Sequence, residues 1–250
     1  MTIALFITCL TDNFYPRSGI AVVKVLEYLG HSVVFPQAQT CCGQPMYNNG
    51  YHNDARDLAR RFLHVFEEYE TIVTPSASCA SMIREYYPTL FKAGTNERMA
   101  IEALSEKTYE FVEYLVRVQK VDLRSLGMKW KGSATYHPSC HLRSLGMHKE
   151  SEQFIEQIEG IDLRPMANSE QCCGFGGSFA VNYPEISASM VRDKVADIKA
   201  SGADTLVCNE AGCSMNIAGA CQRQGVVINT KSLAEIIAEG LGLFDSENES

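Results

Sequence analysis

Hydrophobic residues occur along the chain in short apolar runs that alternate with stretches of helical spacing. The apolar runs predict buried strands over residues 3–8, 32–35, 71–74, 133–136, 205–207 and 226–228, and near residue 163. Apolar residues three and four positions apart predict helices over residues 20–29, 55–69, 149–158, 186–198 and 233–237. Strands that alternate with helices through short connections are typical of parallel sheets, so the sequence predicts an α/β fold.

The predicted elements occur twice in the same order, which indicates two pseudo-symmetric parallel-sheet α/β modules related by internal duplication. We assign the first module to residues 1–90 and the second to residues 132–250. Residues 91–131 have no counterpart in the other half and are expected to form a helical connector, a long helix that carries Met99, Leu104, Phe111, Val112 and Leu115. The acidic end of the chain, residues 245–250, is expected to be disordered.

The composition is that of a globular protein, because 46% of the 250 residues are hydrophobic and 21% are charged. A formal net charge of −8 argues against binding to nucleic acid or to anionic lipid. No apolar run reaches the roughly 18 residues that a membrane span needs. The N-terminus lacks the basic segment of a signal peptide and predicts a strand instead, so we expect a cytoplasmic protein in a reducing environment.

Eight of the ten cysteines form a repeat. Each set has one cysteine, an adjacent pair 32 positions later that a glycine follows, and a last cysteine. The first set is Cys9, Cys41, Cys42 and Cys79, and the second is Cys140, Cys172, Cys173 and Cys213. All eight fall shortly after predicted strands, at the sheet edge where open parallel sheets bind ligands. We therefore expect four thiols to converge in each half.

Four converging thiolates suit a soft metal ion or an iron–sulfur cluster. Adjacent cysteines cannot easily reach one mononuclear centre in tetrahedral geometry, whereas a multi-iron cluster offers them separate iron atoms. The doubled C-x₂-C pattern of structural zinc sites is absent. The glycines after the pairs, Gly43 and Gly174, permit a positive φ and a close approach of the backbone to a ligand.

Other residues near the second set are candidates for chemistry. His137, His141 and Arg143 could donate protons, act as additional ligands or bind a substrate carboxylate. The alternative is that they cap a loop or bond the backbone. Cys221 lies in a helical stretch and is typical of a buried core residue, whereas the role of Cys208, five residues before Cys213, stays open.

The cysteines occur in five longer motifs, which are Thr8-Cys9-Leu10, Cys41-Cys42-Gly43-Gln44-Pro45, Ser78-Cys79, Tyr136-His137-x-Ser139-Cys140-His141 and Cys172-Cys173-Gly174-Phe175-Gly176-Gly177. As a set they resemble the duplicated cysteine-rich CCG domain that occurs in heterodisulfide reductase, in the iron–sulfur subunit of glycolate oxidase and in the lactate utilisation protein A family. The resemblance covers nearly the whole chain and is strongest to the lactate utilisation protein A family.

This resemblance implies a cytoplasmic iron–sulfur oxidoreductase subunit that works with two partner subunits in the oxidation of L-lactate to pyruvate. It also implies one electron-carrying cluster in each half, held by the four cysteines of each set. The sequence departs from the heterodisulfide reductase version, in which each half ends in C-x-x-C, because Ser76 stands at the first such place and Cys208 is displaced. Four ligands in each half still suffice for a conventional 4Fe–4S cluster.

Two other functions stay open at the level of the sequence. In a thiol–disulfide or sulfur-transfer enzyme the adjacent cysteines would be the redox pairs, with His137 or His141 as acid or base. In a zinc-binding interaction module the metal would serve only structure. The chain has no flavin or nicotinamide fingerprint, and its sequence does not distinguish lactate from glycolate or other small 2-hydroxy acids.

Overall fold

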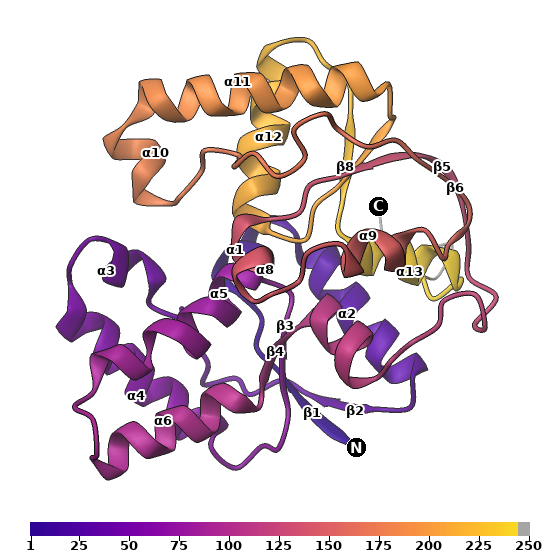
Figure 1. The fold of residues 1–250 in the computed structure, drawn as a ribbon. Helices are drawn as coiled ribbons and strands as arrows, with labels where there is room; N and C mark the ends of the chain where they lie inside the picture. Colours follow the sequence, from indigo (N-terminus) through magenta and orange to yellow (C-terminus); the bar gives the residue numbers. More distant parts are fainter. Residues whose placement is uncertain (245–250) are drawn as a thin grey trace.

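Two four-stranded parallel sheets form the framework of the protein (Figure 1). The computed structural model describes residues 1–244, so the expectation for residues 245–250 lies outside the described part. The first sheet has the strand order β2-β1-β3-β4 and the second the order β6-β5-β7-β8. Their strands are β1 (Thr2–Leu5), β2 (Ser32–Val34), β3 (Ile72–Thr74), β4 (Thr108–Glu110), β5 (Lys129–Tyr136), β6 (Glu159–Leu163), β7 (Thr205–Val207) and β8 (Asn229–Lys231). The predicted fold class, two α/β modules related by duplication, is confirmed.

Helices of matching order accompany each sheet. The first half contains α1 (Cys9–Phe14), α2 (Pro16–Tyr28), α3 (Gln44–Asn48), α4 (His52–Phe66), α5 (Ala77–Ser81), the π-helix η1 (Met82–Tyr86), the 3₁₀ turn η2 (Pro88–Leu90), α6 (Asn96–Glu106), α7 (Phe111–Glu113) and the π-helix η3 (Tyr114–Val118). The second half contains α8 (Cys140–Ser144), α9 (Glu150–Ile155), α10 (Ser178–Asn182), α11 (Pro184–Ser201), α12 (Ala211–Arg223) and α13 (Leu233–Gly240). None of the helices within residues 1–244 is long and apolar enough to cross a membrane.

The helix α4 illustrates why these segments fold as predicted. Ala55, Ala59, Phe62 and Phe66 recur at helical spacing and are all buried. The charged residues between them remain on the solvent side, so the helix can cover the sheet with one apolar face. Its counterpart α11 begins with a proline in its first turn and ends at Gly202, which has a φ of 64°.

Residues 91–131 do not form the long connecting helix predicted for them. The stretch contains α6, β4, α7 and η3, and β4 pairs in parallel with β3 to complete the first sheet. Its apolar residues belong to several short helices that pack on two different cores, since Leu104 lies in the cluster of the first module and Phe111, Val112 and Leu115 lie in the cluster that joins the halves, while Met99 is exposed. A second difference is smaller, since the last strand lies at Asn229–Lys231 and not over residues 226–228. The module boundaries at residues 90 and 132 stay a prediction.

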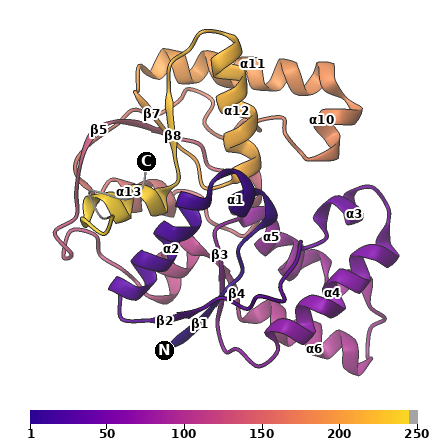
Figure 2. The same cartoon turned by 180° about the vertical axis from the view of Figure 1, so that it is seen from behind.

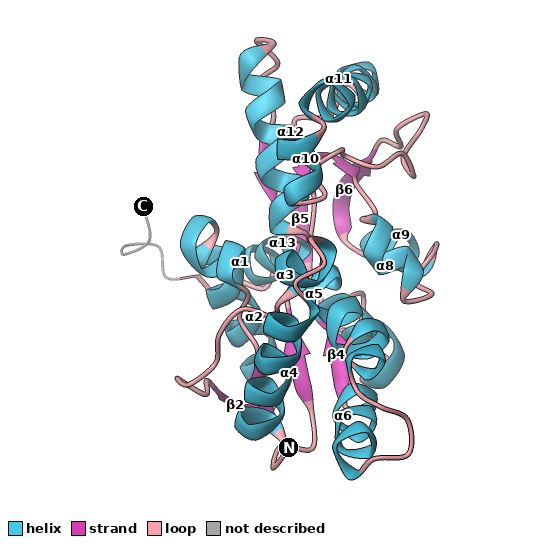
Figure 3. Ribbon diagram, turned by 90° about the vertical axis from the view of Figure 1, so that its left-hand side faces the viewer, coloured by secondary structure: helices cyan, strands magenta, loops and turns pink. Residues whose placement is uncertain are grey.

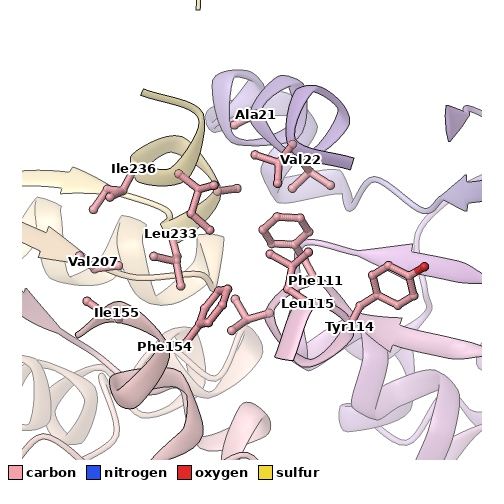
Figure 4. Close-up of a cluster of buried hydrophobic side chains, with 14 of the residues drawn as sticks. Ala21, Val22, Phe111, Tyr114, Leu115, Phe154, Ile155, Val207, Leu233 and Ile236 are labelled. Atoms are coloured by element: carbon pink, nitrogen blue, oxygen red, sulfur yellow. The ribbon is translucent and has the colours of Figure 1, made fainter. Parts of the chain in front are cut away.

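The largest hydrophobic cluster joins the two halves. Figure 4 shows Val22, Phe111 and Leu115 of the first half on one side, with Phe154 and Leu233 of the second half on the other. The helix α2 packs against α13, and η3 packs against α9, so each half contributes equivalent helices to the shared core. Each module also has a smaller core of its own, which contains its buried cysteines.

The modules face each other with the edges that carry the cysteines. In Figures 1 and 3 the two sheets lie at opposite ends of the molecule, with α1, α5 and α8 between them, and Figure 2 shows α1 and α5 in this position from behind. The helix α1 contacts α12, and α5 contacts α8. These two contacts are equivalent under the internal duplication, because α1 and α8 begin with the first cysteine of each set and α5 and α12 carry the last. Both candidate sites therefore lie near the junction of the modules.

Candidate metal centres

The first predicted cysteine quartet comes together at the carboxyl edge of the first sheet. Cys9 begins α1 after β1, Cys41 and Cys42 follow β2, and Cys79 lies in α5 after β3. The Sγ atoms of Cys42 and Cys79 lie 3.2 Å apart. Cys41 hydrogen-bonds to both Cys9 and Cys42, so the four thiols form one continuous chain. The connections of the sheet change direction between β1 and β3, which is where open α/β sheets bind ligands.

The second quartet repeats this arrangement. Cys140 begins α8 after β5, Cys172 and Cys173 follow β6, and Cys213 lies in α12 after β7. The Sγ atoms of Cys173 and Cys213 lie 2.9 Å apart, and Cys172 hydrogen-bonds to both Cys140 and Cys173. Whether the two quartets bind metal stays a prediction, but the structure brings together all eight residues that the sequence selects.

Each quartet extends from the surface into the core of its module. Its first cysteine is exposed, the first cysteine of the adjacent pair is half-buried, and the other two are buried. The exposed members are Cys9 and Cys140. A redox group held by either quartet would therefore be shielded on one side and open to a partner on the other.

One thiol in each quartet is stabilised as a thiolate, Cys41 in the first and Cys172 in the second. Hydrogen bonds from the neighbouring thiols of Cys42 and Cys9 lower the pKa of Cys41. The pKa of Cys172 is lowered in the same way, first by the hydrogen bond from Cys140. The backbone N–H of the glycine after each pair also lies 3.4 Å from this sulfur. Further thiolates in so small a space require a cation between them.

The glycine after each cysteine pair is required by the backbone. Gly43 and Gly174 have φ values of 82° and 81°, a region that other residues rarely adopt. A Cβ on Gly174 would also lie 2.8 Å from the carbonyl oxygen of Ser187 in α11. A Cβ on Gly43 would lie 3.2 Å from the side chain of Leu58 in α4. The turn that presents each cysteine pair thus depends on a left-handed residue packed tightly against a helix.

His137 lies beside the second quartet. Its ring is 1% exposed, and a ring nitrogen lies within 4.8 Å of the thiols of Cys173 and Cys213, which themselves are equally close. Within the described residues, neither ring nitrogen has a hydrogen-bond partner. Burial, followed by the charge of Lys194, lowers the pKa of His137 to about 3, so the ring is neutral. Of the sequence candidates near Cys140, His137 is the one that reaches the buried thiols.

His141 and Arg143 occupy other positions. The Nδ1 atom of His141 lies 3.7 Å from the sulfur of Cys140, and its Nε2 atom lies 3.4 Å from the amide nitrogen of Gln44 in the other half. Arg143 forms an ion pair with Glu170 at 3.0 Å and donates to the carbonyl oxygen of the same residue. Arg143 therefore fixes the segment before Cys172, and its role as a carboxylate-binding group stays a prediction.

Cys208 and Cys221 differ in their surroundings. Cys208 is buried and hydrogen-bonds to Cys213, so it is a fifth thiol at the second quartet. Cys221 is buried in the apolar core of α12, and within residues 1–244 it makes no hydrogen bond to another thiol. The expectation that Cys221 is a core residue agrees with this position.

Several residues of the sites had no sequence prediction. The buried Lys194 of α11 donates to the carbonyl oxygens of Asn168 and Ser169 at 2.7 and 3.1 Å. Glu210 precedes α12 and accepts hydrogen bonds from Ser76 and Ser78 of the other half. The sequence feature that could have indicated Lys194 is its position, as a lysine, on the apolar face of the helix predicted over residues 186–198. Glu210 is the N-cap residue of α12, a helix whose bounds are not predicted from the sequence.

The donor set fits an iron–sulfur cluster better than a hard metal ion. Each quartet offers four soft sulfur ligands and no carboxylate, which disfavours Mg²⁺ or Ca²⁺. Amide N–H groups of Gly43 and Gly174 already point at cysteine sulfurs, as hydrogen bonds around iron–sulfur clusters do. In the second site, the unpartnered ring nitrogens of His137 face sulfur atoms that would carry such a group.

Fold and sites together define a duplicated cysteine-rich α/β protein with a thiol quartet in each half. The family model described as "CCG: Cysteine-rich domain" matches residues 3–84 and 134–218, and the two matched segments contain the two quartets. Curated relatives extend over almost the whole chain. "Lactate utilization protein A" of Shouchella clausii (strain KSM-K16) is 44% identical over 95% of this chain and 98% of that protein. The protein of the same name from Geobacillus sp. (strain WCH70) is 42% identical over 95% of this chain and 99% of its own length. The chain belongs to the lactate utilization protein A family.

Similarity to solved structures is more remote. A putative Asp/Glu racemase from Yersinia pestis is 14% identical and has a TM-score of 0.39, with coverage of 96% of this chain and 97% of that one.

Proposed function

We propose that this chain is an iron–sulfur subunit that carries electrons in the oxidation of L-lactate to pyruvate. The observation that carries the proposal is the duplicated convergence of four thiols at the carboxyl edges of two parallel sheets. Family membership supplies the substrate, since the curated relatives are named for lactate utilization. Cys9, Cys41, Cys42 and Cys79 would hold one 4Fe–4S cluster, and Cys140, Cys172, Cys173 and Cys213 the other.

An iron–sulfur cluster accepts and releases one electron at a time. Conversion of a 2-hydroxy acid to a 2-oxo acid releases two electrons and two protons, so two one-electron centres match the stoichiometry of one turnover. Lactate would be oxidised on one partner subunit. The two electrons would leave one at a time through a second partner to an electron acceptor. Exposed Cys9 and Cys140 give each site an edge at which a partner can approach.

The ten free cysteines support a reducing compartment such as the cytoplasm. A disulfide exchange function has less support, because Cys41 pairs by hydrogen bonds with two thiols, and an adjacent-cysteine disulfide would be strained. The chain of contacts from Cys140 through His141 to Gln44 connects the two sites, which favours a relay over two independent redox pairs.

Iron and sulfide analysis of protein purified or reconstituted without oxygen tests the proposal. We expect about eight iron and eight sulfide per chain, with broad absorbance near 400 nm and an EPR signal on reduction. Cys42→Ala and Cys173→Ala should each lose about half of the iron, because each removes one buried ligand from a different quartet. Cys221→Ala is the matched control and should keep the full iron content. Protein without iron after reconstitution would refute the proposal.

A single metal ion is the second arrangement for which the structure offers donors. The nitrogen of His137 and the thiols of Cys173 and Cys213 lie close enough to share one ion, as in a structural zinc site. Stoichiometric zinc that survives iron reconstitution and depends on His137 would identify this alternative.

A further inference from the structure

Equivalent positions beside the two quartets carry different side chains. Phe6 and His137 each follow the central strand of their sheet, and their backbone N–H groups donate to the carbonyl oxygens of Val73 and Val207, both at 2.9 Å. These bonds show that the two residues occupy the same place in the two modules. In the first module that place holds a buried phenyl ring, and in the second it holds a buried imidazole.

A second pair of positions changes in the same direction. Gly43 faces Leu58 of α4, and Gly174 faces Met190 of α11. Four positions further along these helices are Phe62 and Lys194, one helical turn away on the same face. In the first module the ring of Phe62 packs edge-on against Phe6, with centroids 4.9 Å apart.

The first site is therefore walled by an aromatic pair, and the second by an imidazole and an ammonium group. His137 and Lys194 are both fully or almost fully buried, at 1% and 0% exposed. The charge of Lys194 interacts with Asp197 and with the thiols of Cys173 and Cys172. Among residues 1–244 the nitrogens of His137 have no hydrogen-bond partner, and one of them lies within 4.8 Å of the sulfurs of Cys173 and Cys213. Cys208 adds a third polar group, because it hydrogen-bonds to Cys213 where the first module has Thr74.

These groups affect reduction because a reduced cluster carries one more negative charge than an oxidised one. Hydrogen bonds to the sulfurs and nearby positive charge stabilise the reduced form and raise the reduction potential. The neutral ring of His137 has one N–H that can point at a cysteine sulfur. Aromatic hydrocarbon walls offer no such stabilisation, so Phe6 and Phe62 add nothing to the glycine N–H that points at a cysteine sulfur in both sites.

We propose that the second site has the higher reduction potential, because His137 brings a buried ring nitrogen within 4.8 Å of the Cys173 and Cys213 sulfurs, from where its N–H can be donated to them, and Lys194 adds a buried positive charge to this side of the site. This inference rests on the proposed iron–sulfur function. With both clusters bound, one electron would move from the first centre to the second, so that the first is oxidised and the second is reduced. The donor partner consequently docks near Cys9, and the acceptor partner docks near Cys140. The contacts that join Cys140, His141 and Gln44 lie between the two sites, along this route.

The experiment is an anaerobic redox titration of the reconstituted full chain, followed by EPR. Cys42→Ala leaves only the second cluster and Cys173→Ala leaves only the first, so the two potentials can be assigned. We expect the cluster of Cys42→Ala to be reduced first. We then add one electron per chain to the wild type. Chains reduced at the second site should outnumber chains reduced at the first site by at least about tenfold, which corresponds to a difference of 59 mV between one-electron couples.

Substitutions at the two tuning residues test the cause. In the Cys42→Ala background, His137→Phe and Lys194→Met should each lower the potential of the remaining cluster. His137→Gln retains an N–H donor and Lys194→Arg retains the charge, so the reduction potentials of these variants should stay closer to that of the parent. Val191→Ala on the same face of α11 is the packing control and should leave the potential unchanged.

Equal potentials in the two single-cluster variants, or the reverse order, would overturn the inference while leaving the iron–sulfur function intact. The same conclusion follows if His137→Phe and Lys194→Met retain iron but do not lower the potential. Failure of the function itself looks different, since then neither quartet takes up iron in the wild type.

Discussion

Ser76 and Glu210 occupy equivalent positions in the two modules, and they hydrogen-bond to each other. Each is the N-cap residue of the helix that carries the last cysteine, α5 and α12 respectively. The hydroxyl of Ser76 donates to both carboxylate oxygens of Glu210 at 3.1 Å. The backbone N–H of Ser78 donates to the same carboxylate at 2.9 Å. One side chain therefore ties the loop before Cys79 to the opposite module.

Removal of this carboxylate should destabilise the whole chain. Glu210 is 7% exposed and Ser76 is 1% exposed, so Glu210→Ala leaves buried donors without an acceptor. We expect a loss of about 2–4 kcal/mol in the free energy of unfolding, because unpaired buried polar groups and charge-assisted bonds have costs of this order. Urea unfolding of the metal-free wild type and variant measures this loss in the free energy of unfolding.

The control is Glu185→Ala in the first turn of α11, where the side chain is exposed. Surface substitutions of this kind change stability by about 0.5 kcal/mol or less. Equal stability of the two variants would show that the contact between Ser76 and Glu210 does not hold the modules together.

Most of the fold could be predicted because the strongest signals are local. The strand over residues 205–207 coincides with β7, and the helical spacing of Ala55 to Phe66 coincides with α4. The quartets could be predicted because duplication makes the cysteine spacing visible. Once three strands of a parallel sheet end at one edge, their following residues must meet there.

The missed features depend on contacts between residues distant in sequence. The strand β4 has three residues, and only its pairing with β3 distinguishes Thr108–Glu110 from the helices around it. Lys194 can be buried because carbonyl oxygens 25 and 26 positions away accept hydrogen bonds from its ammonium group. No pattern within a helix shows such partners. The same holds for Glu210, whose partners lie in the other module.

The shared core predicts that both modules unfold together. Leu233 is fully buried in the cluster that joins the halves. Leu233→Ala should cost about 2–5 kcal/mol, the usual range for a large-to-small change in a core. Because the cluster belongs to both modules, circular dichroism and the fluorescence of Trp130 should still report one common transition. Val227→Ala, at a 96% exposed position, is the control and should have little effect. Two separate transitions in the wild type would contradict the prediction.

Glu110 should make stability depend on pH. Burial raises the pKa of Glu110 from about 4.5 to about 8, and the carboxylates of Glu113 and Glu210 act in the same direction. The folded state therefore holds a proton that the unfolded state releases, so stability falls as pH rises from about 4.5 to about 8. The slope is at most about 1.4 kcal/mol per pH unit. Glu110→Gln can still accept the N–H groups of Val112 and Glu113, and it should remove this slope.

Unfolding of the metal-free protein at several pH values measures the effect. The exposed Glu68→Gln is the control, since removal of a solvated carboxyl group should leave the slope of the parent. A wild-type stability that is flat across this range, or a Glu110→Gln variant with the same slope, would contradict the assignment of the buried proton to Glu110.

The turn after each cysteine pair should be more sensitive than an ordinary left-handed glycine. Gly30 has a φ of 87° and open space around its Cα, so Gly30→Ala should cost only the backbone term of roughly 1–2 kcal/mol. Gly174→Ala adds a contact of 2.8 Å with the carbonyl oxygen of Ser187, which is backbone and cannot rotate away. We expect Gly174→Ala to lose more stability than Gly30→Ala. It should also lose about half of its iron, because the displaced turn carries Cys172 and Cys173 while the first quartet is untouched. Calorimetry and iron analysis of both variants measure this, and a Gly174→Ala protein with full iron would show that the turn tolerates a side chain.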